Sequence, residues 1–196
     1  MNGLWYTARG AGLCALIVLT VATVLGAGGA SSSRDPSARV ILQYVHRTAA
    51  VTGFTLVLIH VTTIVTDSLA HVSVAGALIP FAAQYRPNAV ALGSISAYLL
   101  TALIAAALAR GRFAQTRWGS RIWRPIHVLT YPLWALAMLH GALAGTDRSK
   151  GWVILIYLGC ALAVLGAVSV RVIGLEGQTR EPSGRLVRPP ASRPAR

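Results

Sequence analysis

Five apolar runs, each about twenty residues long, account for most of this 196-residue chain. A helix of that length crosses the hydrocarbon core of a bilayer. A membrane barrel would instead show alternating segments of about ten residues. We therefore predict an all-α integral membrane protein, a bundle of five transmembrane helices, with spans at Gly10–Gly29, Gln43–Thr66, Asn88–Ala109, Ile122–Ala144 and Trp152–Ile173.

The composition supports a membrane protein. Only 12% of the residues are charged and the mean hydropathy is +0.60, whereas soluble domains average about 25% charged residues. The formal net charge is +13, which in a soluble chain would point first to nucleic acid. Here the basic residues lie between and after the apolar runs. We expect them to set the topology and to contact anionic lipid headgroups, with no nucleic-acid partner.

The distribution of basic residues also predicts an orientation. Arginines concentrate after the first and third runs and after the fifth. The positive-inside rule then places the N-terminus outside and the C-terminus in the cytoplasm of a bacterial inner or plasma membrane. Residues 1–175 are predicted to form the membrane domain. Residues 176–196, rich in Arg, Pro and Ser, are expected to be a disordered basic tail near anionic lipids.

Two of the runs carry two histidines each. His46 and His60 lie in the second run, and His127 and His140 in the fourth. Ionisable residues inside a membrane are costly, so each is a functional hypothesis. Both runs are expected to start on the cytoplasmic side, which places His46 beside His127 and His60 beside His140, about 20 Å apart along the helices. This pattern predicts two stacked haems, each held by one histidine from each helix.

The helical positions of these histidines give a mixed result. In the second run, His46 and His60 are 14 residues apart, so they lie on nearly the same face of an ideal helix. Gly53 lies midway between them, where a macrocycle or a neighbouring helix has room to approach. In the fourth run, 13 residues leave the two histidines roughly 140° apart. We expect a kink at Pro132 to turn His140 toward the second helix. Hydrogen bonding across helices is the alternative use of a histidine in a membrane.

Haem propionates need cationic partners. Arg47 and Arg124 flank the cytoplasmic histidines and are candidates for this role. Membrane topology alone explains each of them equally well.

Three further polar residues follow the outer histidines. Asp67 and Asp147 could attract a metal cation, but pairing with Arg86 or Arg148 is the expected role. His71 lies in the connection between the second and third runs, a connection that also holds a short apolar stretch suited to the membrane interface. We expect His71 to be a solvated loop residue.

Three segments carry a resemblance to a known family. They are LWYTARGAG, QYVHRTAAVTGFTLVLIH and WRPIHVLTYPLWALAMLH. They resemble the ferric reductase-like transmembrane domain, found in ferric reductases, in NADPH oxidases and in the haem-binding partner of a periplasmic methionine sulfoxide reductase. The resemblance covers roughly residues 4 to 175. It implies a membrane b-type cytochrome with two haems b and an external electron acceptor, and with His46, His60, His127 and His140 as iron ligands.

The chain also departs from that family. It has five runs where some relatives have six, and it shows no Gly-rich phosphate-binding fingerprint. A cytosolic flavoprotein reductase or a membrane quinol is therefore the expected electron donor. Two alternatives are a haem-bearing membrane subunit that serves a separate reductase, and a non-haem transporter that uses its histidines as a proton relay.

Overall fold

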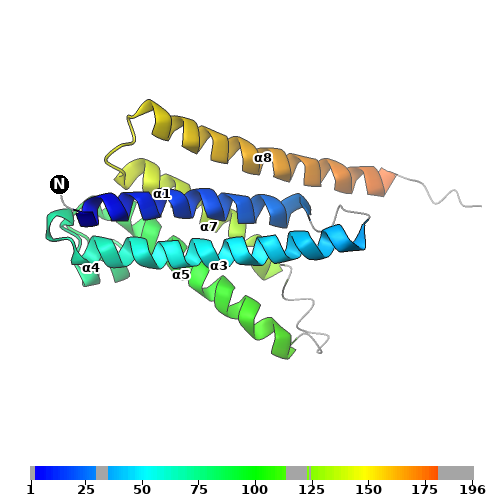
Figure 1. Cartoon of the computed structure of the whole chain (residues 1–196), viewed down its shortest axis with the longest axis horizontal. Coiled ribbons are helices and arrows are strands. Elements are labelled where there is room, and N and C mark those ends of the chain that lie inside the picture. The colour runs from blue at the N-terminus through cyan, green and yellow to red at the C-terminus, as the bar shows by residue number, and fades with distance from the viewer. Residues whose placement is uncertain (1–2, 30–34, 114–122, 124, 181–196) are drawn as a thin grey trace, which may run out of the picture.

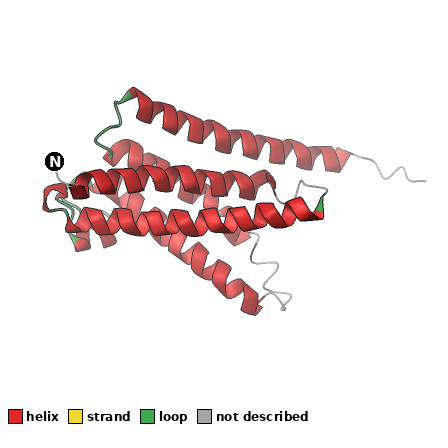
Figure 2. Ribbon diagram, viewed as in Figure 1, coloured by secondary structure: helices red, strands yellow, loops and turns green. Residues whose placement is uncertain are grey.

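A computed structural model describes residues 3–29, 35–113, 123 and 125–180. Regular structure in these residues is entirely helical, and five helices are long and apolar enough to cross a membrane (Figure 2). This confirms the predicted all-helical architecture. The elements are α1 (Gly3–Val24), the π-helical turn η1 (Leu25–Gly29), α3 (Pro36–Thr66), the 3-10 turn η2 (Ser68–Ala70), α4 (Val74–Leu78), α5 (Pro87–Phe113), α7 (Thr130–Ala144) and α8 (Gly151–Arg180).

Helix α1 is the centre of the bundle. It packs antiparallel against α3 along most of its length, and it also contacts α7 and α8 (Figure 1). Helix α5 packs mainly against α7. Helix α1 is therefore the main neighbour of α3.

Two helices begin seven residues before their predicted starts. At α1 the additional turns are held partly by Arg9, whose guanidinium lies 3.9 Å from the ring centre of Trp5, one turn earlier. At α3 the Asp35–Pro36 pair starts the helix. Asp35 caps it by accepting from the Ser37 N–H at 2.9 Å, and proline suits the first helical position. Apolar runs locate the membrane spans, but caps set the helix ends.

Helix α8 also exceeds its predicted length. It continues to Arg180, so residues 176–180, assigned above to the tail, are helical. The remainder of the predicted tail, residues 181–196, lies outside the described residues.

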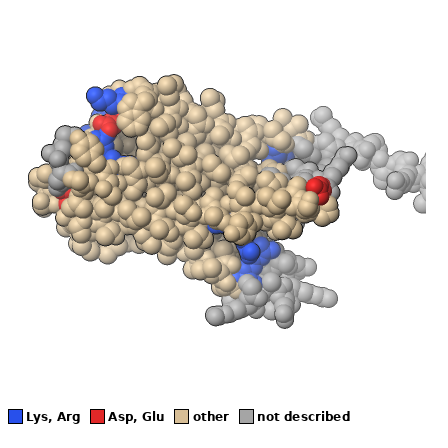
Figure 3. Space-filling view, viewed as in Figure 1, with Lys and Arg blue, Asp and Glu red and all other residues tan. Residues whose placement is uncertain are grey.

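The outer surface is strongly apolar. Leu155 and Leu162 of α8 are each 69% exposed. Charged side chains gather toward the two ends of the molecule, with an uncharged band between them (Figure 3). Such a large exposed apolar surface suits lipid and would be a liability in water. These features are typical of a multi-pass membrane protein.

The fourth span is interrupted near its start. The N–H of Leu129 bonds to the carbonyl of Ile126 at 3.1 Å, a 3-10 pattern, and α7 proper begins at Thr130. Pro132 explains the break, because proline has no N–H for the carbonyl of Val128 and its ring clashes with that carbonyl. The interruption therefore lies one turn before the proline, between His127 and His140.

The connection from α3 to α5 contains two short helical pieces, and the second, α4, lies in the apolar stretch noted in the sequence. Asp67 caps η2, accepting from the Leu69 N–H at 3.1 Å. The following helix, α4, is fixed to α5 by Ser94, whose hydroxyl donates to the Ala77 carbonyl at 2.6 Å.

Candidate functional site: two histidine pairs

The four intramembrane histidines form two pairs. The ring centres of His46 and His127 lie 5.9 Å apart with 76° between their planes. Those of His60 and His140 lie 6.3 Å apart at 78°. In each pair one histidine belongs to α3 and the other to the span that contains α7. The pairs lie at opposite ends of the bundle, about 21 Å apart along α3.

Three of the four rings are oriented by a backbone carbonyl of a neighbouring helix. The Nδ1 atoms of His46, His60 and His140 lie 2.8, 2.6 and 2.8 Å from the carbonyl oxygens of Ala22, Ala8 and Ala89, respectively. A carbonyl only accepts, so Nδ1 must carry the proton in all three. The lone pair is then on Nε2, the state in which histidine binds a metal while donating its other N–H.

Glycines allow these rings to approach the helices. A Cβ atom at Gly12 would lie 2.8 Å from Nδ1 of His60, and one at Gly93 would lie 2.7 Å from Nδ1 of His140. A Cβ at Gly26 would lie 3.2 Å from Cε1 of His46. The sequence alone does not identify Gly12, Gly26 and Gly93, because their role depends on which helices are neighbours in space.

His127 has different surroundings. Its ring stacks on Trp123, with 5.0 Å between ring centres and 22° between planes. The Arg110 guanidinium lies 5.0 Å from the Trp123 ring centre. Nδ1 of His127 is buried and has no hydrogen-bond partner in the described part of the chain. Aromatic and cationic contacts, rather than a carbonyl, therefore hold this ring.

Polar contacts fix the end of the bundle beside His140. Arg9 of α1 forms an ion pair with Asp147, just after α7. The predicted pairing of Asp147 with Arg148 is therefore wrong, because α1 brings a guanidinium from a distant part of the sequence. The hydroxyl of Tyr85 donates to the Ala144 carbonyl at 2.9 Å. These contacts hold the end of α7 one turn after His140.

A cation inside the predicted fifth span holds the opposite end of the bundle. Arg171 of α8 donates to the carbonyls of Ala27 at 3.3 Å and Gly26 at 3.5 Å, in the π-helical turn beside His46. Of the two predicted cations, Arg47 is exposed and forms no ion pair with the described residues. Arg124 lies outside those residues.

Gly53 and His71 also have defined positions. A Cβ at Gly53 would lie 2.6 Å from Cδ2 of Leu19 on α1, so a neighbouring helix occupies the space beside this glycine. His71 is exposed and follows η2 in the left-handed conformation, with φ of 51°. No histidine partner lies beside it among the ring contacts of the described residues.

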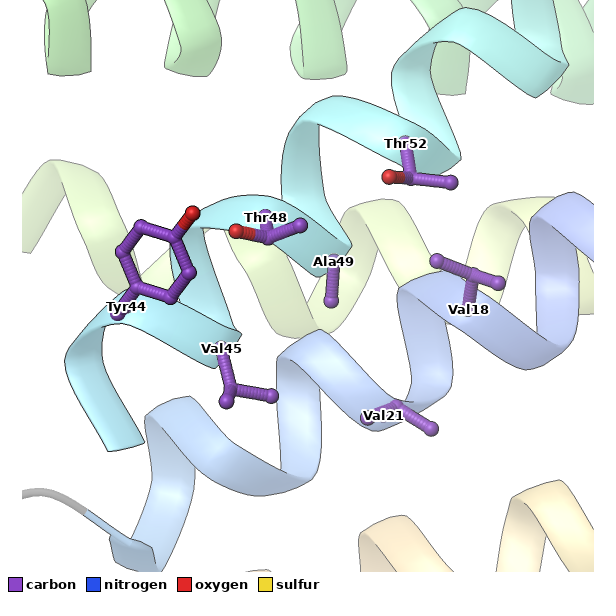
Figure 4. A pocket seen from close by; sticks show the side chains of 7 residues that line it. All are labelled: Val18, Val21, Tyr44, Val45, Thr48, Ala49 and Thr52. Carbon is purple, nitrogen blue, oxygen red and sulfur yellow. The ribbon is translucent and has the colours of Figure 1, made fainter. Parts of the chain in front are cut away.

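A shallow groove of about 320 Å³ lies between α1 and α3. Val18 and Val21 face it from α1, and Tyr44 and Thr48 from α3 (Figure 4). Its lining is almost wholly apolar and it is open to the outside. The groove is therefore part of the lipid-facing surface, and the polar chemistry of this region belongs to the histidine pairs.

The separations within the pairs can be compared with two kinds of contact. A metal–imidazole bond is about 2.1 Å and the ring centre lies about 1.1 Å behind the nitrogen, so two rings on opposite sides of one ion have centres about 6.4 Å apart. A direct hydrogen bond of about 2.9 Å would bring them to about 5 Å. The observed 5.9 and 6.3 Å match the first arrangement. Two neutral imidazoles are a donor set that suits axial ligation of haem iron.

Comparison of the chain with models of protein families, with curated proteins and with solved structures found no match. The function is therefore inferred from the residues of this chain and their geometry.

Proposed function

We propose that this protein is a membrane b-type cytochrome that carries electrons across the membrane, through two bis-histidine haems b, to an external acceptor, as a ferric reductase does. One observation supports this most directly: two pairs of intramembrane histidines, with ring centres 5.9 and 6.3 Å apart, at opposite ends of the bundle. Haem, when bound, supplies a one-electron couple between ferric and ferrous iron.

Each histidine has a defined role in this proposal. Nε2 of His46 and of His127 would hold the haem at one end, and Nε2 of His60 and of His140 the haem at the other. The carbonyl bonds of His46, His60 and His140 orient the rings and raise the basicity of the ligand nitrogens. These contacts would orient three of the four rings for ligation.

The proposed direction of transfer follows from the charge distribution. With the N-terminus outside, the His46–His127 pair lies at the cytoplasmic end and receives electrons from a cytosolic flavoprotein reductase or a membrane quinol. Arg110 lies over Trp123, which stacks on His127, and Arg171 binds the turn beside His46. Together with Arg47 and Arg124, they would provide positive charge for haem propionates. The His60–His140 pair would deliver electrons to the acceptor.

A proton relay fits the same histidines less well. Within each pair the ring centres are farther apart than a direct hydrogen bond permits, and three rings are already bonded to carbonyls. Between the pairs, Phe54 and Val57 of α3 pack against the apolar cluster of Leu100, Leu103 and Leu133. An apolar barrier of this kind blocks protons more effectively than electrons.

Haem stoichiometry tests this proposal. Protein purified in detergent and supplied with haem should contain two haems per chain by pyridine haemochrome assay, with reduced-minus-oxidised b-type bands. His60→Ala and His140→Ala should each lose one haem, and His46→Ala and His127→Ala should each lose the other. His71→Asn is the matched control, because asparagine tolerates the left-handed conformation at that position, and it should retain both haems. A wild-type protein without a Soret band would refute the proposal.

A further inference from the structure

Three of the paired histidines contact their neighbouring helices in the same way. Each donates its Nδ1–H to an alanine carbonyl, and each ring lies over the glycine four residues after that alanine. The units are Ala22–Gly26 for His46, Ala8–Gly12 for His60, and Ala89–Gly93 for His140. The same arrangement occurs on two different helices, which indicates a common role.

Helix geometry explains the spacing of four. The carbonyl of residue i accepts the N–H of residue i+4, and the side chain of residue i+4 stands on the same face. The carbonyl has a second lone pair, but a side chain at i+4 would block a ring from reaching it. A Cβ at Gly12 or Gly93 would lie within 3.0 Å of the ring nitrogen, closer than real Cβ contacts. Glycine at i+4 therefore makes the carbonyl accessible.

The spacing along α1 matches the spacing along α3. Ala8 and Ala22 are 14 residues apart in α1, and His46 and His60 are 14 residues apart in α3. Because the two helices are antiparallel, Ala8 meets His60 and Ala22 meets His46. Helix α1 thus places both histidines of α3 in the same way, one at each end of the bundle.

His127 is the exception. Its buried Nδ1 has no hydrogen-bond partner in the described part of the chain. Helix α5 supplies the carbonyl for His140, but from Ser94 to Arg110 it contains no glycine, so the carbonyls of residues 90–106 each have a side chain at i+4. The two histidine pairs are therefore unequal: one has two carbonyl-bonded rings, and the other has one.

We propose that Gly12, Gly26 and Gly93 are positioning residues that fix the Nδ1–H tautomer of three ligands, and that the missing fourth contact makes the haem at His46–His127 the one of higher reduction potential. This inference rests on the proposed function. A ligand without the carbonyl bond is less basic, so it stabilises ferric iron less. Positive charge near His127 acts in the same direction, since the Arg110 guanidinium lies 5.0 Å from the ring centre of Trp123, which stacks on His127.

Redox titration of the haem-loaded protein tests the inference. In wild type, the higher of the two midpoint potentials should disappear in His127→Ala. Gly12→Ala and Gly93→Ala should raise the potential of the His60–His140 haem and leave the other unchanged. Gly10→Ala, in the same helix as Gly12, is the matched control. A Cβ at Gly10 meets nothing within 4 Å, so this variant should leave both potentials unchanged. Equal shifts in Gly10→Ala and Gly12→Ala would overturn the inference.

Nitrogen NMR of protein labelled with ¹⁵N-histidine gives a second measurement that does not depend on haem. Three ring signals should show the Nδ1–H tautomer, and each glycine substitution should change one of them. Gly26→Ala is the mildest variant, since its Cβ contact is 3.2 Å, and it should still fold and affect only His46. If wild type binds no haem, the proposed function fails, while the tautomers still decide the role of the glycines. Unchanged tautomers in all three variants would refute that role.

Discussion

Gly53 gives a direct test of how closely α1 and α3 pack. A Cβ at this position would lie 2.6 Å from Cδ2 of Leu19 and 3.6 Å from its backbone nitrogen. Since real Cβ contacts below 3.0 Å essentially do not occur, Leu19 must move or the helices must separate. Overpacking of this kind costs about 1–3 kcal/mol, and alanine recovers about 0.5–1 kcal/mol of helix propensity. From the midpoints of these ranges, Gly53→Ala should therefore lower the free energy of unfolding by about 1 kcal/mol.

The assay is unfolding in mixed micelles with increasing SDS, followed by circular dichroism. Gly159→Ala on α8 is the matched control, since a Cβ there meets nothing within 4 Å, and it should be neutral or slightly stabilising. Adding Leu19→Ala to Gly53→Ala removes the clash. The effects of the two substitutions on the free energy of unfolding should therefore depart from additivity by about 0.5–3 kcal/mol. The packing described here is wrong if Gly53→Ala is as stable as Gly159→Ala and shows no coupling to Leu19.

Three further predictions concern single hydrogen bonds. Tyr85→Phe removes the bond to the Ala144 carbonyl and should cost about 0.5–1.5 kcal/mol of unfolding free energy, whereas Tyr44→Phe, at an exposed tyrosine without such a bond, should be neutral. Trp134→Phe removes the indole bond to the Thr20 hydroxyl at 2.9 Å and should cost about 0.6 kcal/mol; an equal loss in a Thr20→Val background would contradict this pairing. Hydrogen bonds from Ser37 lower the pKa of the Asp35 carboxyl. The cap that ionised Asp35 gives to α3 is therefore intact above the ordinary aspartate pKa, and it is lost as the pH falls through the lowered pKa. Amide exchange in the first turn of α3 should then increase at low pH relative to Asp35→Asn, which caps without titrating, and identical pH profiles for the two proteins would refute the prediction.

The sequence was sufficient to predict the helical architecture and the number of membrane-length spans. The length of the apolar runs determines both, because a backbone that crosses lipid has few alternatives to a helix. The helix ends were predicted poorly. Asp35 and Pro36 lie before the predicted second span, yet they are the cap and first residue of α3. Hydropathy measures the membrane crossing, whereas capping chemistry decides where hydrogen bonding begins.

The interruption at Leu129 shows another limit. Pro132 correctly marked a disturbance in the fourth span, but the break lies one turn earlier, where the carbonyl of Val128 loses its donor. The pairing of Arg9 with Asp147 was not predictable either. It depends on two helices meeting in space, and the sequence offered nearer arginines for the same aspartate.

The positioning glycines could not be identified from the sequence pattern alone. Alanine precedes glycine by four residues at six places in the chain, and of the five units whose glycine contacts the structure describes, three hold a histidine. Ala49–Gly53 instead contacts Leu19. What distinguishes the three is the partner on the facing helix, which requires the register of α1 against α3 and of α5 against α7.

Electron paramagnetic resonance of the oxidised, haem-loaded protein tests the central claim most directly. Two bis-histidine sites predict two low-spin ferric haems per chain. Because the ring planes within the pairs are 76° and 78° apart, both signals should be of the highly anisotropic type given by nearly perpendicular axial imidazoles. His140→Ala should remove one of them and leave the other intact. A single haem, high-spin five-coordinate iron, or no haem in the wild-type protein would contradict the account.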